Sequence, residues 1–410
     1  MNPGRAPALG SFLQKKYLLM LSFRSTLALG LTLLHFYSSS AQSAVMEHVP
    51  LDEMEALSAN HLSSWRDEET AMAVAIVGLN NGVGFIDVSQ PQQPSYMGKL
   101  PSHYGHSLFR ESVVYKDHLY VISKAEHHGL QVFSLQELRK RSTQPLLFEE
   151  TNHIAAFGEA VHISLDEQNE RMFITGASPH RPFGFTTWCY SLKNPSQPAL
   201  ETQLEFENNV RTVLGATLRN CSQGLETLLI AVGGQSIQIF NAAQLDALEL
   251  VSEIPLQTVA ATNSVFIDSE SAELFAIERT DPSIHSKDSG FAVVTYDISK
   301  VRTPLFKKRT YGKGEYRSAS LHGKSLFVAN ATAGAFALDM SRIFSAAPIP
   351  LYITDNDGIA TPFLGAWDIE VAGSEAPILV SDYTKGLYII APPTTTVNAV
   401  SNELFGSISH

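Results

Sequence analysis

Cysteine is nearly absent from this sequence, with two residues in 410, which excludes a small domain held together by many disulfides. Positive charge is also scarce, because 29 Lys and Arg stand against 41 Asp and Glu, for a formal net charge of −12. A nucleic-acid-binding protein needs a basic face to pair with phosphates, so this balance argues against one. Charged residues of both signs make up 17% of the chain, below the roughly 25% that is usual in soluble domains.

Amphipathic helical periodicity is almost missing after residue 65, where short alternating apolar runs are separated by Gly, Asn, Asp and Pro. Such runs with turn residues between them are typical of β-strands. Hydrophobic residues still make up 44% of the chain, so disorder of the whole chain is excluded. A chain of 410 residues exceeds one ordinary domain of roughly 100–200 residues. It suits either two domains or one closed repeat architecture.

Acidic residues are absent from residues 1–43, which carry four basic residues, an apolar stretch over 25–37 and then small residues. This order indicates a secretory signal peptide over 1–43, cleaved after Ala41 or Ser43. An uncleaved membrane anchor is the alternative, but Arg24 would then lie inside the span at a cost of about 2.5–3.5 kcal/mol near mid-bilayer. We therefore expect a secreted extracellular protein, or one associated with the cell surface, with no membrane span in the mature chain.

Two features fit an oxidising compartment. The two cysteines, Cys189 and Cys221, both follow the expected signal peptide and are candidates for one disulfide. The sequons that begin at Asn220 and Asn330 are candidates for N-glycosylation. A glycan on Asn220 would disfavour the disulfide, because its bulk would lie beside Cys221.

A repeated unit runs through most of the chain. Its clearest copy extends from Ala73 to Ser89, where Asn80-Asn81-Gly82 is expected to make the hairpin turn because Asn and Gly tolerate positive φ. Seven such copies follow one another, with a period of about 50 residues, which indicates an all-β, seven-bladed β-propeller. Two β-sandwich domains are the alternative, since they also use many short strands.

The repeat also sets the expected boundaries. An N-terminal segment covers 44–64, the propeller covers 65–392, and a polar C-terminal tail covers 393–410. The last copy lacks an outer strand, because little apolar sequence follows Ile390. N-terminal residues are therefore expected to supply that strand and to close the ring, which limits exposed sheet edges.

Several stretches have the order and composition of a known repeat family. They are Ala75-Ile-Val-Gly with Gly84-Phe-Ile-Asp-Val-Ser, His128-Gly-Leu-Gln-Val-Phe-Ser-Leu, and Gly365-Ala-Trp with Val380-Ser-Asp-Tyr-Thr-Lys-Gly-Leu-Tyr. They resemble the choice-of-anchor B proteins, which are secreted propellers built from LVIVD-type repeats. The resemblance covers most of residues 65–391 and is weakest over 200–315. It implies export and a propeller fold, and it implies no particular reaction.

The same family typically shows histidines near the start of several first strands, where their side chains can face the central channel. Grouped imidazoles there would suit a transition metal. This chain has Val161 where a histidine is expected, with His162 one place later, and the corresponding segments hold Asn263 and Arg317. We therefore predict no metal in the channel and no cofactor.

Most other histidines lie in polar loops. His103, His106, His127 and His153 are interpreted as solvated, because a metal site needs three or more converging ligands. His128 is the exception, since it lies in the stretch that best matches the family, and it is a candidate ligand-binding residue.

Three arginines stand at or near the start of first strands: Arg110, Arg211 and Arg317. If their registers agree, their guanidinium groups meet at one end of the channel, where they would favour a carboxylate or phosphate. The alternative is local pairing, for example of Arg317 with Glu315 or with Asp368, because a register error of one residue turns a side chain to the other face.

Two functions remain open. The first is a secreted or cell-surface binding module, whose loops recognise an extracellular macromolecule or a glycan. The alternative is an exported, hydrolase-like enzyme with its site at the mouth of the channel. An enzyme needs a cluster of perturbed titratable groups in a pocket, whereas a channel lined by Val, Asn and Ser would count against catalysis. No catalytic residues can be assigned from the sequence.

Overall fold

The computed structural model describes residues 45–140, 142–177, 186–206, 210–218, 227–233, 236–256, 264–279, 290–340, 348–352 and 364–392. Asn220, Cys221 and Asn263 lie outside these residues, as do the expected signal peptide and the C-terminal tail.

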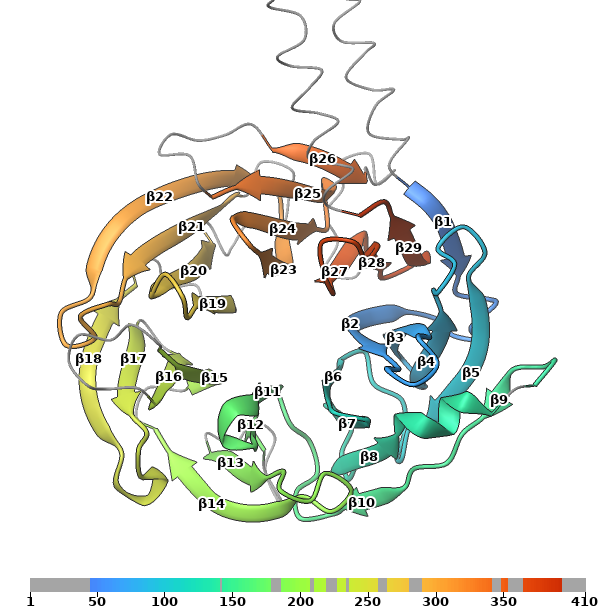
Figure 1. The fold of residues 1–410 in the computed structure, drawn as a ribbon, viewed down its shortest axis with the longest axis horizontal. Helices are drawn as coiled ribbons and strands as arrows, with labels where there is room; N and C mark the ends of the chain where they lie inside the picture. Colours follow the sequence, from blue (N-terminus) through green and yellow to red (C-terminus); the bar gives the residue numbers. More distant parts are fainter. Residues whose placement is uncertain are drawn as a thin grey trace, which may run out of the picture. The chain divides into compact units, whose positions relative to one another are not determined.

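Seven small sheets stand in a ring around a central axis, so the predicted seven-bladed propeller is confirmed (Figure 1). Neighbouring strands within the blades pair antiparallel, except for one short outer strand of blade 1, and the chain runs from an inner strand outward. The described part of the chain contains no α-helix, only three short 3-10 helices, η1 (Leu135–Arg139), η2 (Glu167–Asn169) and η3 (Leu245–Ala247). No helix in that part has the length and apolarity that crossing a membrane requires.

In each of the first four blades, the strands are ordered as follows from the axis outward. Blade 1 holds β2 (Ala59–Arg66), β3 (Ala73–Leu79), β4 (Gly82–Asp87) and β5 (Ser95–Pro101), with the two-residue strand β9 (Leu146–Leu147) added in parallel. Blade 2 holds β6 (Arg110–Tyr115), β7 (His118–Ser123), β8 (Leu130–Ser134) and β10 (Asn152–Ile154). Blade 3 holds β11 (His162–Asp166), β12 (Arg171–Thr175), β13 (Thr186–Ser191) and β14 (Ala199–Glu205). Blade 4 holds β15 (Val210–Thr217), β16 (Thr227–Gly233), β17 (Ser236–Asn241) and β18 (Glu249–Pro255).

The remaining three blades complete the ring. Blade 5 holds β19 (Ser264–Asp268), β20 (Glu273–Arg279), β21 (Gly290–Asp297) and β22 (Leu305–Lys313). Blade 6 holds β23 (Tyr316–His322), β24 (Ser325–Asn330), β25 (Gly334–Asp339) and β26 (Ile349–Tyr352). Blade 7 holds β27 (Ala366–Val371), β28 (Ile378–Asp382), β29 (Gly386–Ile390) and the N-terminal strand β1 (Val45–Pro50).

Blade 7 closes the ring as expected, because its outer strand comes from the N-terminal end of the described chain. β1 pairs antiparallel with β29, from Val45 opposite Ile390 to Pro50 opposite Gly386. Gly386 has φ of +113°, and a Cβ there would lie 2.3 Å from the carbonyl oxygen of Val49. This close approach of two backbones requires glycine. The segment 44–64 also includes the start of β2, so the ring uses residues before position 65.

The first hairpin lies where the sequence predicts it, but for a different physical reason. Leu79 pairs with Gly82, which leaves Asn80 and Asn81 as the two-residue loop. Neither asparagine has positive φ. The buried side chain of Asn80 instead accepts a hydrogen bond from the backbone N–H of Leu57 at 2.8 Å, which ties this turn to the segment before β2.

Apolar side chains fill the space between neighbouring blades. Phe85 of blade 1 stacks on Phe133 of blade 2 with ring centroids 5.2 Å apart, and Phe148 meets the edge of Phe85 at 5.5 Å. All three are buried in one cluster. Aromatic side chains dominate the buried area of such interfaces, so these residues hold the blades together and are not a surface for stacking a ligand.

Candidate ligand site at a channel mouth

The inner strands of all seven blades begin around one end of the central axis, where they enclose a cavity of about 540 Å³. We call this cavity the mouth. Its titratable lining residues are His61, Arg110, Glu111, Lys124, His162, Arg211, Arg317 and Asp368. The channel is therefore not a plain surface of Val, Asn and Ser.

Bulges in three inner strands place side chains at the mouth. The pairing of β15, β23 and β27 with their neighbours shifts at Arg211, Arg317 and Trp367, each of which is left without an opposite residue. A bulge adds one residue to a strand and re-aims its side chain. The same irregularity thus recurs in blades 4, 6 and 7, and each copy brings a cationic or aromatic residue to one cavity.

Two cations and two aromatic rings form one cluster at the mouth. The Lys124 ammonium lies 4.4 Å from the ring centroid of Phe109, and the Arg317 guanidinium carbon lies 4.6 Å from that of Trp367. The two ring centroids are 5.9 Å apart. Cation–π contacts of this kind stabilise a charge next to a ring. Residues from blades 2, 6 and 7 are therefore joined in a single cationic and aromatic surface.

Positive charge at the mouth exceeds what the neighbouring carboxylates neutralise. Arg317 pairs with the buried Glu315 at 2.9 Å, as one of the sequence-based alternatives proposed. Arg211 is exposed, and neither it nor Lys124 forms an ion pair with another described residue. Burial lowers the pKa of Lys124, and the nearby Arg211 lowers it further, while Glu111 opposes the shift. Two cationic groups thus stand close together with room for an anion.

Arg110 also borders the mouth, but its guanidinium is buried between blades 1 and 2. Its Nε donates to the carbonyl oxygen of Leu79 at 3.1 Å, and its other nitrogens lie 2.9 Å from Ser102 Oγ and 2.8 Å from His128 Nε2. The three arginines of the sequence hypothesis are therefore divided. Arg211 and Arg317 present side chains to the mouth, and Arg110 joins two blades.

His128 is neutral and also belongs to this interior contact. Burial and the adjacent Arg110 lower its pKa to about 3. Its Nε2 must accept the hydrogen bond from Arg110, since a guanidinium only donates. The proton therefore sits on Nδ1, which donates to the carbonyl oxygen of Gly129 at 3.0 Å.

His61 and Asp368 form an ion pair between blades 1 and 7. His61 Nδ1 lies 2.9 Å from Asp368 Oδ2, and His61 Nε2 lies 2.8 Å from the carbonyl oxygen of Ser112. Neither acceptor carries a proton to donate, so both ring nitrogens are donors and the ring is an imidazolium. Burial alone would lower the pKa of His61, but the Asp368 carboxylate outweighs it, and the net effect raises that pKa to about 9.

This pair predicts a pH dependence of stability. A histidine whose pKa rises from 6.5 to about 9 on folding stabilises the fold fully below pH 6.5 and loses that contribution as the pH rises to 9. The His61 side chain is still 29% exposed, so solvent screens part of the interaction, and we expect a loss of about 2 kcal/mol. Urea unfolding at a series of pH values measures it. In His61→Gln this fall between pH 6.5 and 9 should disappear, and a fall of the same size in that variant would contradict the assignment.

Glu111 and His162 form a second pair across blades 2 and 3. His162 Nδ1 donates to Glu111 Oε2 at 2.9 Å, and the same oxygen accepts from the backbone N–H of Ile163 at 3.2 Å. Burial alone would raise the pKa of Glu111, but His162 and His61 beside it hold that pKa below its usual value. The other nitrogen of His162, Nε2, is buried and has no hydrogen-bond partner among the described residues.

The other end of the channel has the opposite charge. A second cavity of about 690 Å³ shares His61, Leu214 and Asp368 with the mouth, and so continues it along the axis. Its ionisable lining also includes Asp166, Glu167, Glu270 and Glu370. Burial raises the pKa of Glu370. The channel is therefore cationic where the inner strands begin and acidic where they end.

Two further predicted positions are less accessible than the sequence suggests. Asn330 is fully buried, its amide nitrogen donates to the carbonyl oxygen of Lys313 at 2.9 Å, and its amide oxygen accepts from Thr332. Glycosylation of Asn330 stays a prediction. Cys189 is buried, with its Sγ 3.6 Å from Glu201 Oε2. Its expected partner Cys221 lies outside the described residues, so the disulfide stays a prediction.

Several residues of the mouth are missed by reading the sequence alone. His61 lies in the N-terminal segment 44–64, which was expected to precede the propeller, and Lys124 directly follows β7 with no motif around it. Trp367 is part of Gly365-Ala-Trp, one of the quoted stretches, so a signal for it was present.

No protein-family model matches the chain, and no curated protein matches it. The structure therefore establishes the propeller on its own.

Proposed function

We propose that this protein is an exported binding module whose mouth takes the carboxylate of an acidic sugar at the end of a glycan chain. The observation that carries the proposal is the pair of cations, Lys124 and Arg211, that share a cavity with the Phe109–Trp367 rings. They stand in a protein with a formal net charge of −12. The net charge of the protein repels anions, so an anion is attracted only close to these two cations.

The chemistry of the mouth favours a sugar acid over other anions. Its volume of about 540 Å³ falls in the range of roughly 300–1,000 Å³ that is typical of small-molecule sites. That is too small for the folded surface of a protein partner. Arg binds carboxylates in a planar, bidentate manner, and aromatic rings offer flat apolar area for the faces of sugar rings. A terminal uronic acid combines both features.

Export and family membership are part of the same proposal. They rest on the basic, apolar and small-residue order of residues 1–43 and on the resemblance to choice-of-anchor B propellers. A secreted or surface-associated protein would meet acidic glycans outside the cell, which is consistent with a binding role.

Calorimetric titration with trigalacturonate tests the proposal. We expect one saturable site that weakens as salt increases, because exposed charges are screened within about 10 Å at 0.1 M salt. Replacement of Arg211 by Ala should weaken binding about tenfold to a hundredfold, since hydrogen bonds to charged groups contribute about 1.5–3 kcal/mol.

The matched control is Arg302→Ala, which removes an exposed arginine that does not line the mouth. It should leave the affinity unchanged. Neutral trigalactose of the same length should bind far more weakly than the uronate. Equal loss of affinity in the two arginine variants, or equal binding of both sugars, would contradict the proposal.

Catalysis is the second candidate, and one contact favours it. His162 is oriented by Glu111 through Nδ1, while its Nε2 has no hydrogen-bond partner among the described residues. A histidine held in this way by a carboxylate is the usual arrangement of a general base. Release of shorter uronates from trigalacturonate, lost in His162→Gln with binding retained, would support a hydrolase. No cleavage by the wild-type protein would exclude this activity on that substrate.

A further inference from the structure

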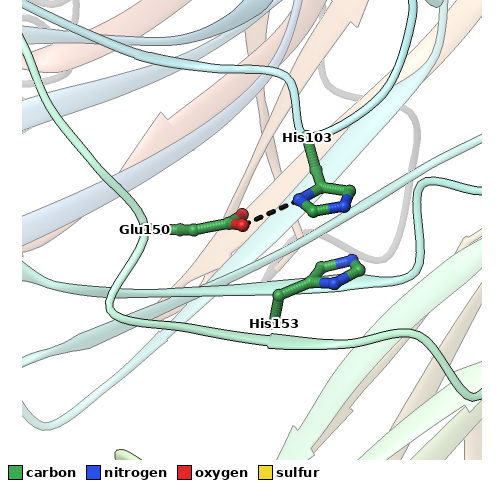
Figure 2. A group of neighbouring side chains, drawn as sticks. All are labelled: His103, Glu150 and His153. Carbon is green, nitrogen blue, oxygen red and sulfur yellow. Dashed lines mark hydrogen bonds and ion pairs between the residues drawn. The ribbon is translucent and has the colours of Figure 1, made fainter.

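A separate cluster of side chains lies where the loop after β5 meets β10 and the residues before it. His103 comes from blade 1, and Glu150 and His153 come from blade 2 (Figure 2). One possible ligand atom from each of the three lies within 4.8 Å of the others. His103 Nδ1 is 2.7 Å from Glu150 Oε1, and the two imidazole rings stack with centroids 3.4 Å apart. These histidines are thus brought together and are not separately solvated.

Neighbouring groups hold two of these side chains in place. The amide nitrogen of Gln131 donates to Glu150 Oε2 at 2.9 Å, which leaves Oε1 toward His103. His153 Nε2 lies 2.8 Å from the carbonyl oxygen of His128, and since a carbonyl only accepts, that nitrogen carries the proton. The lone pair of His153 is therefore on Nδ1. Metal-binding histidines almost always donate their other ring nitrogen to a carbonyl or carboxylate in this way.

The backbone beside the cluster enters the left-handed region twice, at a cost in energy for His127 and without one for glycine. His127 has φ of +62° and Gly129 has φ of +65°. A Cβ at Gly129 would lie 2.5 Å from the carbonyl oxygen of Ile154 and 2.9 Å from His153 Nε2, so glycine leaves the space that the His153 ring occupies. Left-handed conformations of residues other than glycine concentrate at functional sites.

We propose that His103, Glu150 and His153 bind one Zn²⁺ ion on the outer loops between blades 1 and 2. Two imidazoles and one carboxylate are a common protein ligand set for zinc, with a fourth position left for water. Ligand atoms around a tetrahedral ion with bonds of 2.0–2.1 Å stand about 3.3 Å apart. The present ligand atoms lie within 4.8 Å of one another, so the side chains must draw together around the ion for it to bind. This site is distinct from the channel, and it does not depend on the sugar-binding proposal.

Calorimetric titration of the tag-free protein with Zn²⁺ tests this site. We expect one equivalent to bind and to raise the unfolding temperature, because a ligand that binds only the folded state stabilises it. Glu150→Gln keeps the size of the side chain and its contact with Gln131 but removes the charge, and it should weaken binding at least tenfold. His153→Ala should do the same.

The matched control is His106→Ala, which removes an exposed histidine from the same loop as His103. It should bind Zn²⁺ as the wild-type protein does. Circular dichroism confirms that each variant is folded before titration. The proposal is overturned if the wild-type protein binds no Zn²⁺ at millimolar concentration. It is also overturned if Glu150→Gln and His153→Ala both bind with unchanged affinity, which would place the ion on other histidines.

Discussion

Replacement of Asp368 by Asn is expected to lower the free energy of unfolding by about 3–5 kcal/mol, the usual cost of removing one partner of a buried ion pair. Asp368 Oδ2 accepts from the backbone N–H of Leu62 at 2.7 Å and from His61 Nδ1 at 2.9 Å. Oδ1 accepts from Ser318 Oγ and from the N–H of Ile369. One carboxylate therefore links blades 6, 7 and 1. In asparagine one of these oxygens is replaced by an NH₂ group, which is a donor and would face the N–H or O–H donors that now bind the carboxylate.

The Asp368 variant is measured by urea unfolding at pH 6, where His61 is charged. Asp52→Asn, at an exposed turn position, is the matched control and should change the stability by less than about 0.5 kcal/mol. We expect a loss of at least about 3 kcal/mol in Asp368→Asn. A loss below about 1 kcal/mol would mean that this carboxylate does not hold the inner side of the ring together.

Replacement of Val49 by Asp should open the ring on its outer side. Val49 is 2% exposed and packs in β1 against Leu387 and Ile389 of β29. An unpaired carboxylate in that apolar contact costs several kcal/mol, and β1 is the strand that joins the two ends of the propeller. We expect a loss of roughly 4 kcal/mol or more, together with rapid proteolysis of the freed N-terminal segment.

Glu47→Gln tests whether this effect belongs to burial or to the strand as a whole. Glu47 lies on the same strand and is exposed, so its replacement should leave both unfolding and proteolysis unchanged. If Val49→Asp retained wild-type stability, β1 would be a dispensable edge and not the closing strand.

The ring and its closure could be predicted because they depend on features that recur. Each blade repeats the same order of apolar runs and turns, and a missing outer strand in the last copy predicts a donor elsewhere in the chain. The turn at Asn80 shows the limit of such reading. The location was predicted, but the asparagines stabilise it through a side-chain hydrogen bond to Leu57 and not through positive φ.

The site was only partly predictable, because its side chains are aimed by irregularities that composition does not reveal. Bulges bring Arg211 and Arg317 to the mouth, whereas Arg110, in a strand paired without a shift, turns its guanidinium toward Leu79 and His128. All three arginines look alike in the sequence. Which of them faces the channel depends on the partner atoms that other blades supply.

The loop histidines show a second limit. His103 and His153 are fifty positions apart in the sequence and were interpreted as solvated, and only the packing of blade 1 against blade 2 places one ring on the other. A ligand count along the sequence cannot find ligands that two repeats contribute jointly.

The central claim is that the mouth binds an acidic sugar, and tryptophan fluorescence during titration with trigalacturonate tests it most directly. Trp367 lines the mouth, while Trp65 and Trp188 are buried in clusters between blades. We predict a saturable change in fluorescence for the wild-type protein, with the same midpoint as calorimetry, and no such change for Trp367→Phe. A change of equal size in Trp367→Phe, or calorimetric binding without any change in the wild-type protein, would place the sugar elsewhere and contradict the account.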